Sequence, residues 1–342
     1  MSEIFLHVGY GKTGTTAVQG WLLRNRDALA DRGILDCGTA MHNPVFKPSV
    51  AQSVPALVQC IGADRSGTAA QLAAQVNDAA EDYQTIVWSS EFMLARMEFV
   101  SEFVQGIDDK HDVKIVIYLR NHIDWLLSAY AQWAIKHPIT MEGPGVASFD
   151  NFVAQRINDL DYVSKLSAWS SIEGAELLPR SYDAQSNIVA DFVELLGLDI
   201  ADFPVARGKT NENLGRAQLS LLKIIQENTE NKIDYRRFTK MLADAGAAAS
   251  NVHPVDPTAI SVDAQRLAEL HDGFARQRRK LNTDFGVKLS DTFKANRNGS
   301  VEGSNDTNTD LISMLGMVCY TLAQRTAALE RKIKDISARQ QP

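Results

Sequence analysis

A glycine-rich segment near the start of the chain constrains the fold more than any other feature. It runs from Gly9 to Thr16, reads GYGKTGTT, and lies between an apolar run over residues 4–8 and an amphipathic stretch over residues 17–22. This order predicts a β-strand, a tight turn and the start of a helix. Backbone N–H groups in the first turn of a helix have no intrahelical partner and lie at the positive end of the helix dipole. The segment therefore predicts an anion-binding loop that suits a phosphate group.

The position of the lysine sets this loop apart from the usual nucleoside-triphosphate loop, whose motif is G-x-x-x-x-G-K-[ST]. The chain keeps the glycine spacing with Gly9 and Gly14, but Thr15 stands where the lysine is expected. The lysine lies inside the loop instead, as Lys12. The residues predicted to hold the anion are Gly11, Lys12, Thr13, Gly14, Thr15 and Thr16.

A second motif, YLRNHIDWLLSAY over residues 118–130, directly follows a β-rich run over residues 113–117. Arg120 stands at the end of the predicted strand, and Ser128 lies about two turns along the helix expected after it. A guanidinium can form two parallel hydrogen bonds with phosphate oxygens, and a hydroxyl adds another donor. Arg120 and Ser128 therefore form a second candidate phosphate site.

Together the two motifs resemble those of sulfotransferases that use 3'-phosphoadenosine 5'-phosphosulfate (PAPS), in particular the bacterial carbohydrate-type enzymes. The resemblance covers roughly residues 1–230. It implies that Lys12 contacts the oxygen between phosphate and sulfate, and that Arg120 and Ser128 bind the 3'-phosphate of PAPS as co-substrate. The family commonly has proline where this chain has His122.

The same resemblance implies a loop around Arg207 and Lys209 that closes over the nucleotide, for which a solvated basic turn is the alternative. It also implies transfer of the sulfuryl group to a hydroxyl or amine of a small-molecule or glycan acceptor, a carbohydrate or a glycolipid. Sulfuryl transfer requires no metal clamp, and the sequence predicts none. A P-loop kinase using ATP would require Mg²⁺. That kinase and a non-catalytic assembly protein with a vestigial nucleotide site are the alternative functions.

Two residues are candidates for the general base that takes the proton of the acceptor. Glu91 directly follows the second predicted strand, at the sheet edge where doubly wound folds bind ligands. Trp88 and Phe92 beside it are expected to raise its pKa, which favours Glu91. His42 lies nearer in sequence to the position of the base in the carbohydrate-type enzymes. The structural alternatives are a carboxylate at a helix start and a histidine in a surface loop.

Short β-rich runs alternate with helical patterns, which predicts an α/β fold: a P-loop NTPase-like parallel sheet flanked by helices. Further strands are expected over residues 85–88 and ending near residue 182, with helices over residues 67–82 and 188–196. The first helix is expected to end near Gly33. Residues 34–66 contain three prolines and are predicted to be an irregular, substrate-facing stretch.

The predicted domain organisation has three parts. Residues 1–294 form the catalytic domain, and residues 295–310 form a polar, flexible linker without apolar periodicity. Residues 311–340 carry apolar side chains at alternating spacings of three and four, which predicts a C-terminal coiled-coil-like helix and a homo-oligomer. The alternatives for this helix are docking on the catalytic domain and contact of its basic end with a membrane surface.

Composition excludes other classes of protein. A net charge of -7 and a pI near 5.6 argue against a nucleic-acid binder. The sequence shows neither a signal peptide nor a membrane span, so we expect a cytoplasmic enzyme. Cys37, Cys60 and Cys319 lack metal-ligand spacing and suit reduced thiols.

Overall fold

The structure is a computed structural model that describes residues 1–137, 146–203, 216–228, 233–244 and 262–293, together with seven helical residues between 315 and 329. The chain divides into two compact units. The first comprises Met1–Trp125, Asn158–Gly208 and His271–Asp291, and the second comprises Leu126–Ile157, Lys209–Leu270 and Thr292–Pro342. The predicted linker over residues 295–310 lies outside the described residues.

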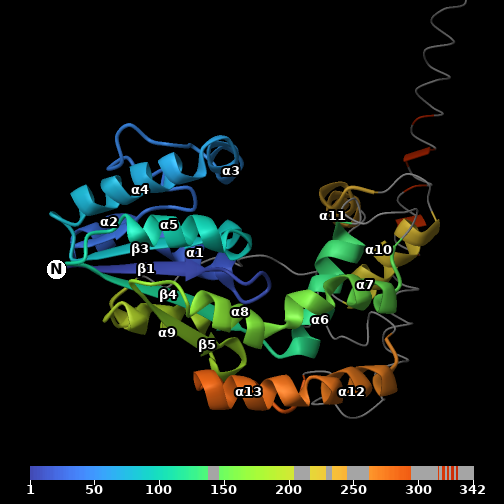
Figure 1. Ribbon diagram of the computed structural model, residues 1–342. Helices are drawn as coiled ribbons and strands as arrows, with labels where there is room; N and C mark the ends of the chain where they lie inside the picture. The colour runs from blue at the N-terminus through green and yellow to red at the C-terminus, as the bar shows by residue number, and fades with distance from the viewer. Residues whose placement is uncertain are drawn as a thin grey trace, which may run out of the picture. The chain divides into compact units, whose positions relative to one another are not determined.

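The first unit is built on a five-stranded parallel sheet (Figure 1). Across the sheet the strands are β2 (Ile34–Asp36), β3 (Thr85–Ser90), β1 (Glu3–Val8), β4 (Asp112–Leu119) and β5 (Ala175–Ser181). The predicted parallel α/β architecture is therefore confirmed. Because all strands run in the same direction, their carboxyl ends lie at one edge of the sheet, and the central strand β1 has β3 on one side and β4 on the other.

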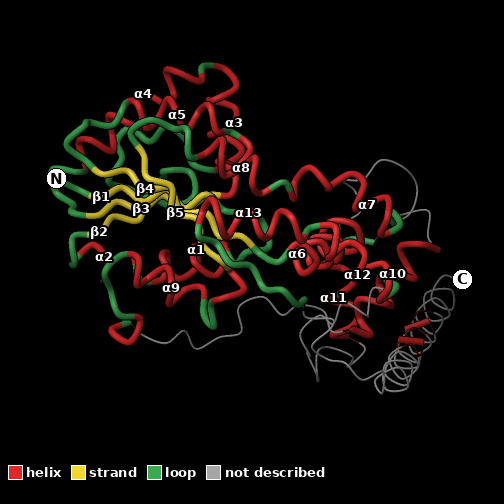
Figure 2. Tube along the Cα trace, turned by 60° about the horizontal axis from the view of Figure 1, so that its bottom comes forward, coloured by secondary structure: helices red, strands yellow, loops and turns green. Residues whose placement is uncertain are grey.

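Helices cover both faces of this sheet, which appears as the yellow layer in Figure 2. The helices of the first unit are α1 (Thr15–Arg24), α2 (Arg26–Ala30), α3 (Val54–Ala63), α4 (Arg65–Ala79), α5 (Met97–Gln105), α8 (Tyr162–Trp169), α9 (Ile188–Leu195) and α13 (Ala275–Phe285). On one face, Val87 and Val116 pack with Trp21 of α1 and Phe192 of α9. On the other face, Trp88 of β3 packs on Phe103 of α5, with ring centroids 5.3 Å apart.

The prediction that residues 34–66 form an irregular stretch is wrong in two places. It contains the strand β2, which is only three residues long and therefore too short to show a periodic pattern. It also contains α3, where the Ser53 side chain caps the helix by accepting a hydrogen bond from the N–H of Ala56. Pro55 suggested a loop, but the first turn of a helix tolerates proline because its N–H groups have no intrahelical partner.

The predicted helix ending near Gly33 is also divided, because Asn25 (φ −106°, ψ 14°) separates α1 from α2. The Asn25 side chain donates a hydrogen bond to the carbonyl of Trp21 and so stabilises the break.

The second unit is helical where the structure describes it. Helix α6 (His122–Ala129) runs into it and continues as a π-helical segment over Tyr130–Lys136, and the other helices are α7 (Phe149–Arg156), α10 (Arg216–Asn228), α11 (Tyr235–Asp244) and α12 (Ala264–Gly273). The ring of Tyr130 packs edge-on against Phe149 and Phe152, with centroids 5.4 Å apart in both pairs. None of the described helices is both long enough and apolar enough to cross a bilayer.

The predicted C-terminal helix is described only at residues 315, 318, 319, 322, 325, 326 and 329, which are helical. Leu315, Leu322 and Leu329 lie on the predicted seam and are exposed. Val318 is buried, and Arg325 pairs with Asp244 of α11 at 2.6 Å. The rest of residues 311–340 lies outside the described part of the chain, so the coiled coil and the homo-oligomer stay predictions.

The core of the first unit contains a histidine that must stay neutral. His7 of β1 is fully buried against the rings of Tyr118 and Phe192, and its Nδ1 lies 2.8 Å from the Ser89 hydroxyl. Burial lowers the pKa of His7 to about 4. The folded state therefore binds this proton less readily than the unfolded state, and the stabilisation is present above pH 6.5 and is lost as the pH falls toward 4.

We expect the wild-type protein to lose more stability on acidification than a His7→Asn variant, whose amide can still pair with Ser89. The extra loss in the free energy of unfolding between about pH 7 and pH 4 should be about 3 kcal/mol. Urea denaturation of both proteins at a series of pH values measures this extra loss. Subtracting the free energies of the variant from those of the wild type cancels the contributions of the other titrating groups. Parallel pH profiles for the two proteins would contradict the assignment.

Candidate active site

The carboxyl edge of the sheet gathers most of the predicted site residues. The glycine-rich loop follows β1, Glu91 follows β3 and Arg120 follows β4. Since β1 lies between β3 and β4, the loop lies between the other two strand ends. This is also where the chain order reverses across the sheet, the usual place for a ligand in an open α/β fold.

The loop itself is a tight turn held by its own hydrogen bonds. Lys12 and Gly14 both have positive φ angles, 72° and 81°, which are unfavourable for a residue with a Cβ atom. The N–H and the hydroxyl of Thr13 both donate to the carbonyl of Tyr10. The indole Nε1 of Trp125 donates to the carbonyl of Gly11 at 2.8 Å. Thr13 therefore shapes the turn, and its hydroxyl is already used.

Several donors of the loop lack a protein partner. Within the described part of the chain, no hydrogen bond is made by the backbone N–H groups of Gly11, Lys12, Gly14, Thr15 and Thr16. The Thr15 hydroxyl is buried and also has no partner among the described residues. A buried donor such as the Thr15 hydroxyl is costly when unpaired, and the free N–H groups beside it lie at a helix start, so the loop fits an anion such as a phosphate.

Gly9 allows this close packing. A Cβ atom at Gly9 would lie 2.7 Å from the Cγ2 atom of Thr15 and 2.8 Å from the Cγ atom of Glu91. Both distances are too short for a side chain at this position. The absence of a side chain therefore lets the β1 end, the start of α1 and Glu91 approach one another.

Lys12 lies in a field of two opposing charges. Burial lowers the pKa of Lys12, the neighbouring Arg120 guanidinium lowers it further, and the Glu91 carboxylate acts in the opposite direction. Glu91 itself is exposed, and the ring of Trp88 is buried in the core beside Phe103. The predicted effect of Trp88 and Phe92 on Glu91 stays a prediction.

Arg120 contacts the loop directly. Its Nη1 donates to the carbonyl of Lys12 at 3.1 Å, and its guanidinium lies 5.3 Å from the ring centroid of Tyr182. Its Nε is buried and makes no hydrogen bond with the described residues. One face of the guanidinium therefore rests on an aromatic ring, while an N–H remains available for an anion.

The residue after Arg120 fixes its position. The Asn121 side-chain oxygen accepts from the N–H of Ile123 at 2.9 Å at the start of α6, and its amide donates to the carbonyl of Ser290 at 2.8 Å. The Asn121 N–H donates to the Asp183 carboxylate. One of these contacts is local and the other two come from distant segments of the chain, and together they hold the strand end in one conformation.

Tyr182 and Trp125 are site residues that the sequence did not identify. Tyr182 lies under Arg120 and also beside Gly14, where an added Cβ atom would meet its ring at 3.2 Å. Tyr182 directly follows β5, so its place at the strand end was the available signal. Trp125 offered no such signal, because an indole on a helix usually packs in the core.

The other predicted site residues lie in different parts of the chain, and the structure does not bring them all together. His42 lines a cavity of about 310 Å³ that also includes Thr16, whose side chain is exposed. Ser128 lies on α6 but in the second unit, so its pairing with Arg120 stays a prediction. Arg207 and Lys209 lie outside the described residues.

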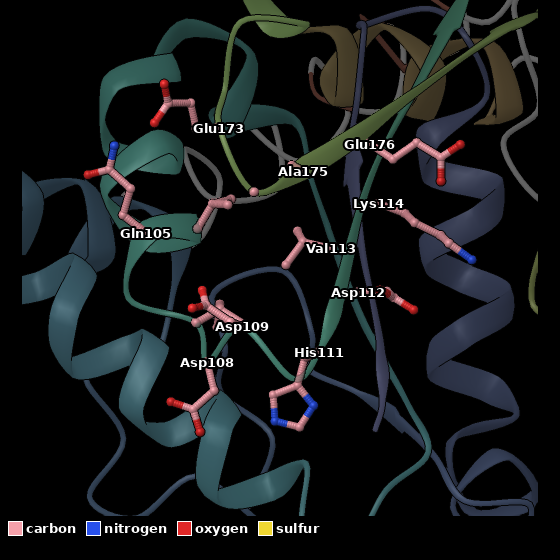
Figure 3. A pocket seen from close by; sticks show the side chains of 13 residues that line it. Gln105, Asp108, Asp109, His111, Asp112, Val113, Lys114, Glu173, Ala175 and Glu176 are labelled. Atoms are coloured by element: carbon pink, nitrogen blue, oxygen red, sulfur yellow. The ribbon is translucent and has the colours of Figure 1, made fainter.

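A larger cavity of about 750 Å³ lies at the opposite edge of the sheet, where β4 and β5 begin (Figure 3). None of the predicted site residues lines it. Its wall is mainly acidic, with the carboxylates of Asp108, Asp109, Asp112, Glu173 and Glu176. Such a wall repels anions, so this cavity does not suit a phosphorylated nucleotide.

Comparisons with known proteins give limited similarity. No protein-family model matches the chain. An uncharacterized protein of Archaeoglobus fulgidus is 33% identical over 147 residues, which is 42% of this chain and 38% of the archaeal protein. The crystal structure of a sulfotransferase from Alicyclobacillus acidocaldarius aligns with 65% of this chain and 91% of its own, at 19% identity and a TM-score of 0.31. A TM-score of this size establishes neither a shared fold nor a shared function.

Proposed function

We propose that the protein is a PAPS-dependent sulfotransferase that transfers a sulfuryl group to a hydroxyl or amine acceptor. The observation that carries the proposal is the glycine-rich loop with its lysine inside the turn, in contact with Arg120 from the next strand end. A phosphate cradle and two adjacent cations suit a nucleotide with more than one anionic group.

The unpaired donors divide into two sets. The backbone N–H groups of Gly11, Lys12, Gly14, Thr15 and Thr16 and the Thr15 hydroxyl would bind the 5'-phosphate, since they converge at the start of α1. Arg120 and Ser128 would bind the 3'-phosphate, and the loop with Arg207 and Lys209 would close over the nucleotide. PAPS supplies an activated sulfuryl group, so Lys12 need only stabilise the negative charge that develops on the departing phosphate oxygen.

The charges around Lys12 suit Glu91 to a role in which it acts on Lys12 rather than on the acceptor. Burial and Arg120 both favour loss of the Lys12 proton, and a neutral lysine could not stabilise the departing oxygen. Glu91 opposes both effects and lies beside Gly9 at the start of the same loop. We therefore assign Glu91 the task of keeping Lys12 protonated.

As the pH rises, a Glu91→Gln variant should lose its activity at a lower pH than the wild type does. Removal of the carboxylate lowers the pKa of Lys12 further, so the alkaline limb of the kcat/KM profile should move down by roughly 0.5–1 pH unit. The exposed Glu98→Gln change on α5 is the matched control and should leave the profile in place. Disappearance of the acidic limb with a rate loss of about 100-fold or more would show that Glu91 is the general base instead.

Nucleotide binding tests the proposed function. We would titrate the full-length protein with 3'-phosphoadenosine 5'-phosphate (PAP) and with ADP by calorimetry, with and without Mg²⁺. The proposal predicts clear preference for PAP and no requirement for the metal ion. Equal or tighter binding of ADP, or binding that requires Mg²⁺, would favour a kinase and contradict the proposal.

A further inference from the structure

The smaller cavity opens beside the phosphate-binding loop, at the carboxyl end of β2. Its volume is about 310 Å³, and its wall includes Thr16 from the start of α1 and His42 from the segment after β2. At roughly 30 Å³ for each water-sized group, it has room for about ten non-hydrogen atoms, about the size of one sugar ring. Thr16 belongs to both the loop and the cavity, so a molecule in the cavity lies next to the anion bound by the loop.

Apart from the titratable His42, the charged residues in the wall of this cavity sum to a net charge of zero. Arg26 and Asp36 both line it, and they pair with each other, since Nη2 and Nε of Arg26 lie 2.7 and 3.1 Å from Oδ2 of Asp36. The Asp36 side chain is buried, and its Oδ1 accepts from the N–H of Gly38 at 3.0 Å. The charge of the Arg26 guanidinium is therefore already compensated by Asp36, so the cavity offers an anionic ligand no free cation.

The rest of the wall combines apolar and uncharged polar groups. Leu22 and Leu23 of α1 supply the apolar part. Gln19 and Thr39 add polar groups without charge, and the Gln19 amide is held by a hydrogen bond of 3.2 Å to the carbonyl of Ser89. A neutral sugar has the same combination, because its ring presents C–H groups on its faces and hydroxyls around its rim.

His42 is held in a fixed place in this wall. Its ring lies over Gly38, where an added Cβ atom would come within 2.6 Å of the ring carbon Cε1. The same segment is anchored by the indole of Trp88, which donates to the carbonyl of Thr39 at 3.3 Å. Nδ1 of His42 is buried and has no partner among the described residues. A neutral imidazole can accept a proton from a hydroxyl within its reach.

We propose that this cavity binds the acceptor, an uncharged, hydroxyl-bearing group about the size of one sugar ring, and that His42 is the general base. This inference rests on the proposed sulfuryl transfer. In the step, the acceptor oxygen forms a bond with sulfur while the bond from sulfur to the bridging phosphate oxygen breaks. The electron pair of that bond stays on the phosphate of PAP, and the hydroxyl proton moves to the imidazole of His42.

A matched pair of acceptors tests the charge preference in the full-length protein. In methyl β-glucuronide a carboxylate replaces the CH₂OH group of methyl β-glucoside, and PAPS conversion to PAP reports turnover of each at the hydroxyls that the two share and at the extra one of the glucoside. We expect kcat/KM to be at least about tenfold higher for the glucoside, because the carboxylate would lose water without gaining a free cation. Leu23→Arg adds an unpaired cation at the exposed lip and should narrow or reverse the preference, whereas the uncharged Leu23→Gln should not.

A His42→Gln variant tests the base. We expect kcat to fall by about 100-fold or more while the affinity for PAP changes by less than about twofold. The inference is overturned by equal or better use of the glucuronide, by an unchanged preference in Leu23→Arg, by full activity of His42→Gln, or by failure of both glycosides in a protein that binds PAP. A protein that neither binds PAP nor converts PAPS would instead overturn the proposed function.

Discussion

A Lys12→Ala variant should lose at least about 100-fold in kcat, because no other cation inside the loop can take over the stabilisation of the departing phosphate oxygen. Lys12 is held at its position by the tight turn and is partly desolvated, as its lowered pKa shows. A charge in such a place stabilises the transition state more strongly than a charge in water. Steady-state kinetics with PAPS and a saturating acceptor measure the effect.

Binding of the product nucleotide separates catalysis from folding in this experiment. PAP lacks the sulfuryl group, so its affinity should fall by less than about tenfold in Lys12→Ala, while turnover falls much further. Lys110→Ala removes an exposed lysine that pairs with Glu81, and this control should keep full activity. Unchanged turnover in Lys12→Ala would contradict the proposed mechanism.

An Arg120→Ala variant should lose the preference for a 3'-phosphorylated nucleotide. PAP and 5'-AMP differ only by that phosphate, so the ratio of their dissociation constants isolates its contribution. Loss of a charged, bidentate contact at a half-buried site should reduce this ratio by about 30- to 150-fold, which corresponds to about 2–3 kcal/mol. Calorimetry with both nucleotides measures the ratio.

Two further variants define what Arg120 does. Arg120→Lys keeps the charge but not the planar fork, and should retain only part of the preference. Arg24→Ala, at the exposed far end of α1, should retain all of it. If Arg120→Ala weakened the binding of PAP and of 5'-AMP equally, the guanidinium would act at the 5'-phosphate, near the carbonyl of Lys12 that it already contacts.

The sequence predicted the parts of the fold that have strong local patterns. The strands β1, β3 and β4 are six to eight residues long and each contains an apolar run of three to five residues, and the glycines after β1 mark the turn. The strand β2 has three residues and shows no period. The helix α3 has a proline in its first turn, where proline is favourable, and a composition rule alone interprets that proline as a helix breaker.

The same contrast holds for the candidate site. Lys12 and Arg120 could be identified because each lies in a recognisable segment at the end of a strand. The contact of Trp125 with Gly11 spans 114 residues, and the stacking of Tyr182 under Arg120 depends on how β5 pairs with β4. The charge pairing of Arg26 with Asp36 also requires the tertiary fold, and it decides which acceptors the cavity suits. Such contacts leave no periodic signal in the sequence.

The most direct test of the central claim is acceptor-dependent conversion of PAPS to PAP by the purified full-length protein, with ATP and Mg²⁺ supplied in a parallel reaction. The account predicts PAP release without a metal ion, together with a product that is heavier than the acceptor by one SO₃ group. Absence of that product, or formation of ADP and a phosphorylated acceptor in the parallel reaction, would contradict it.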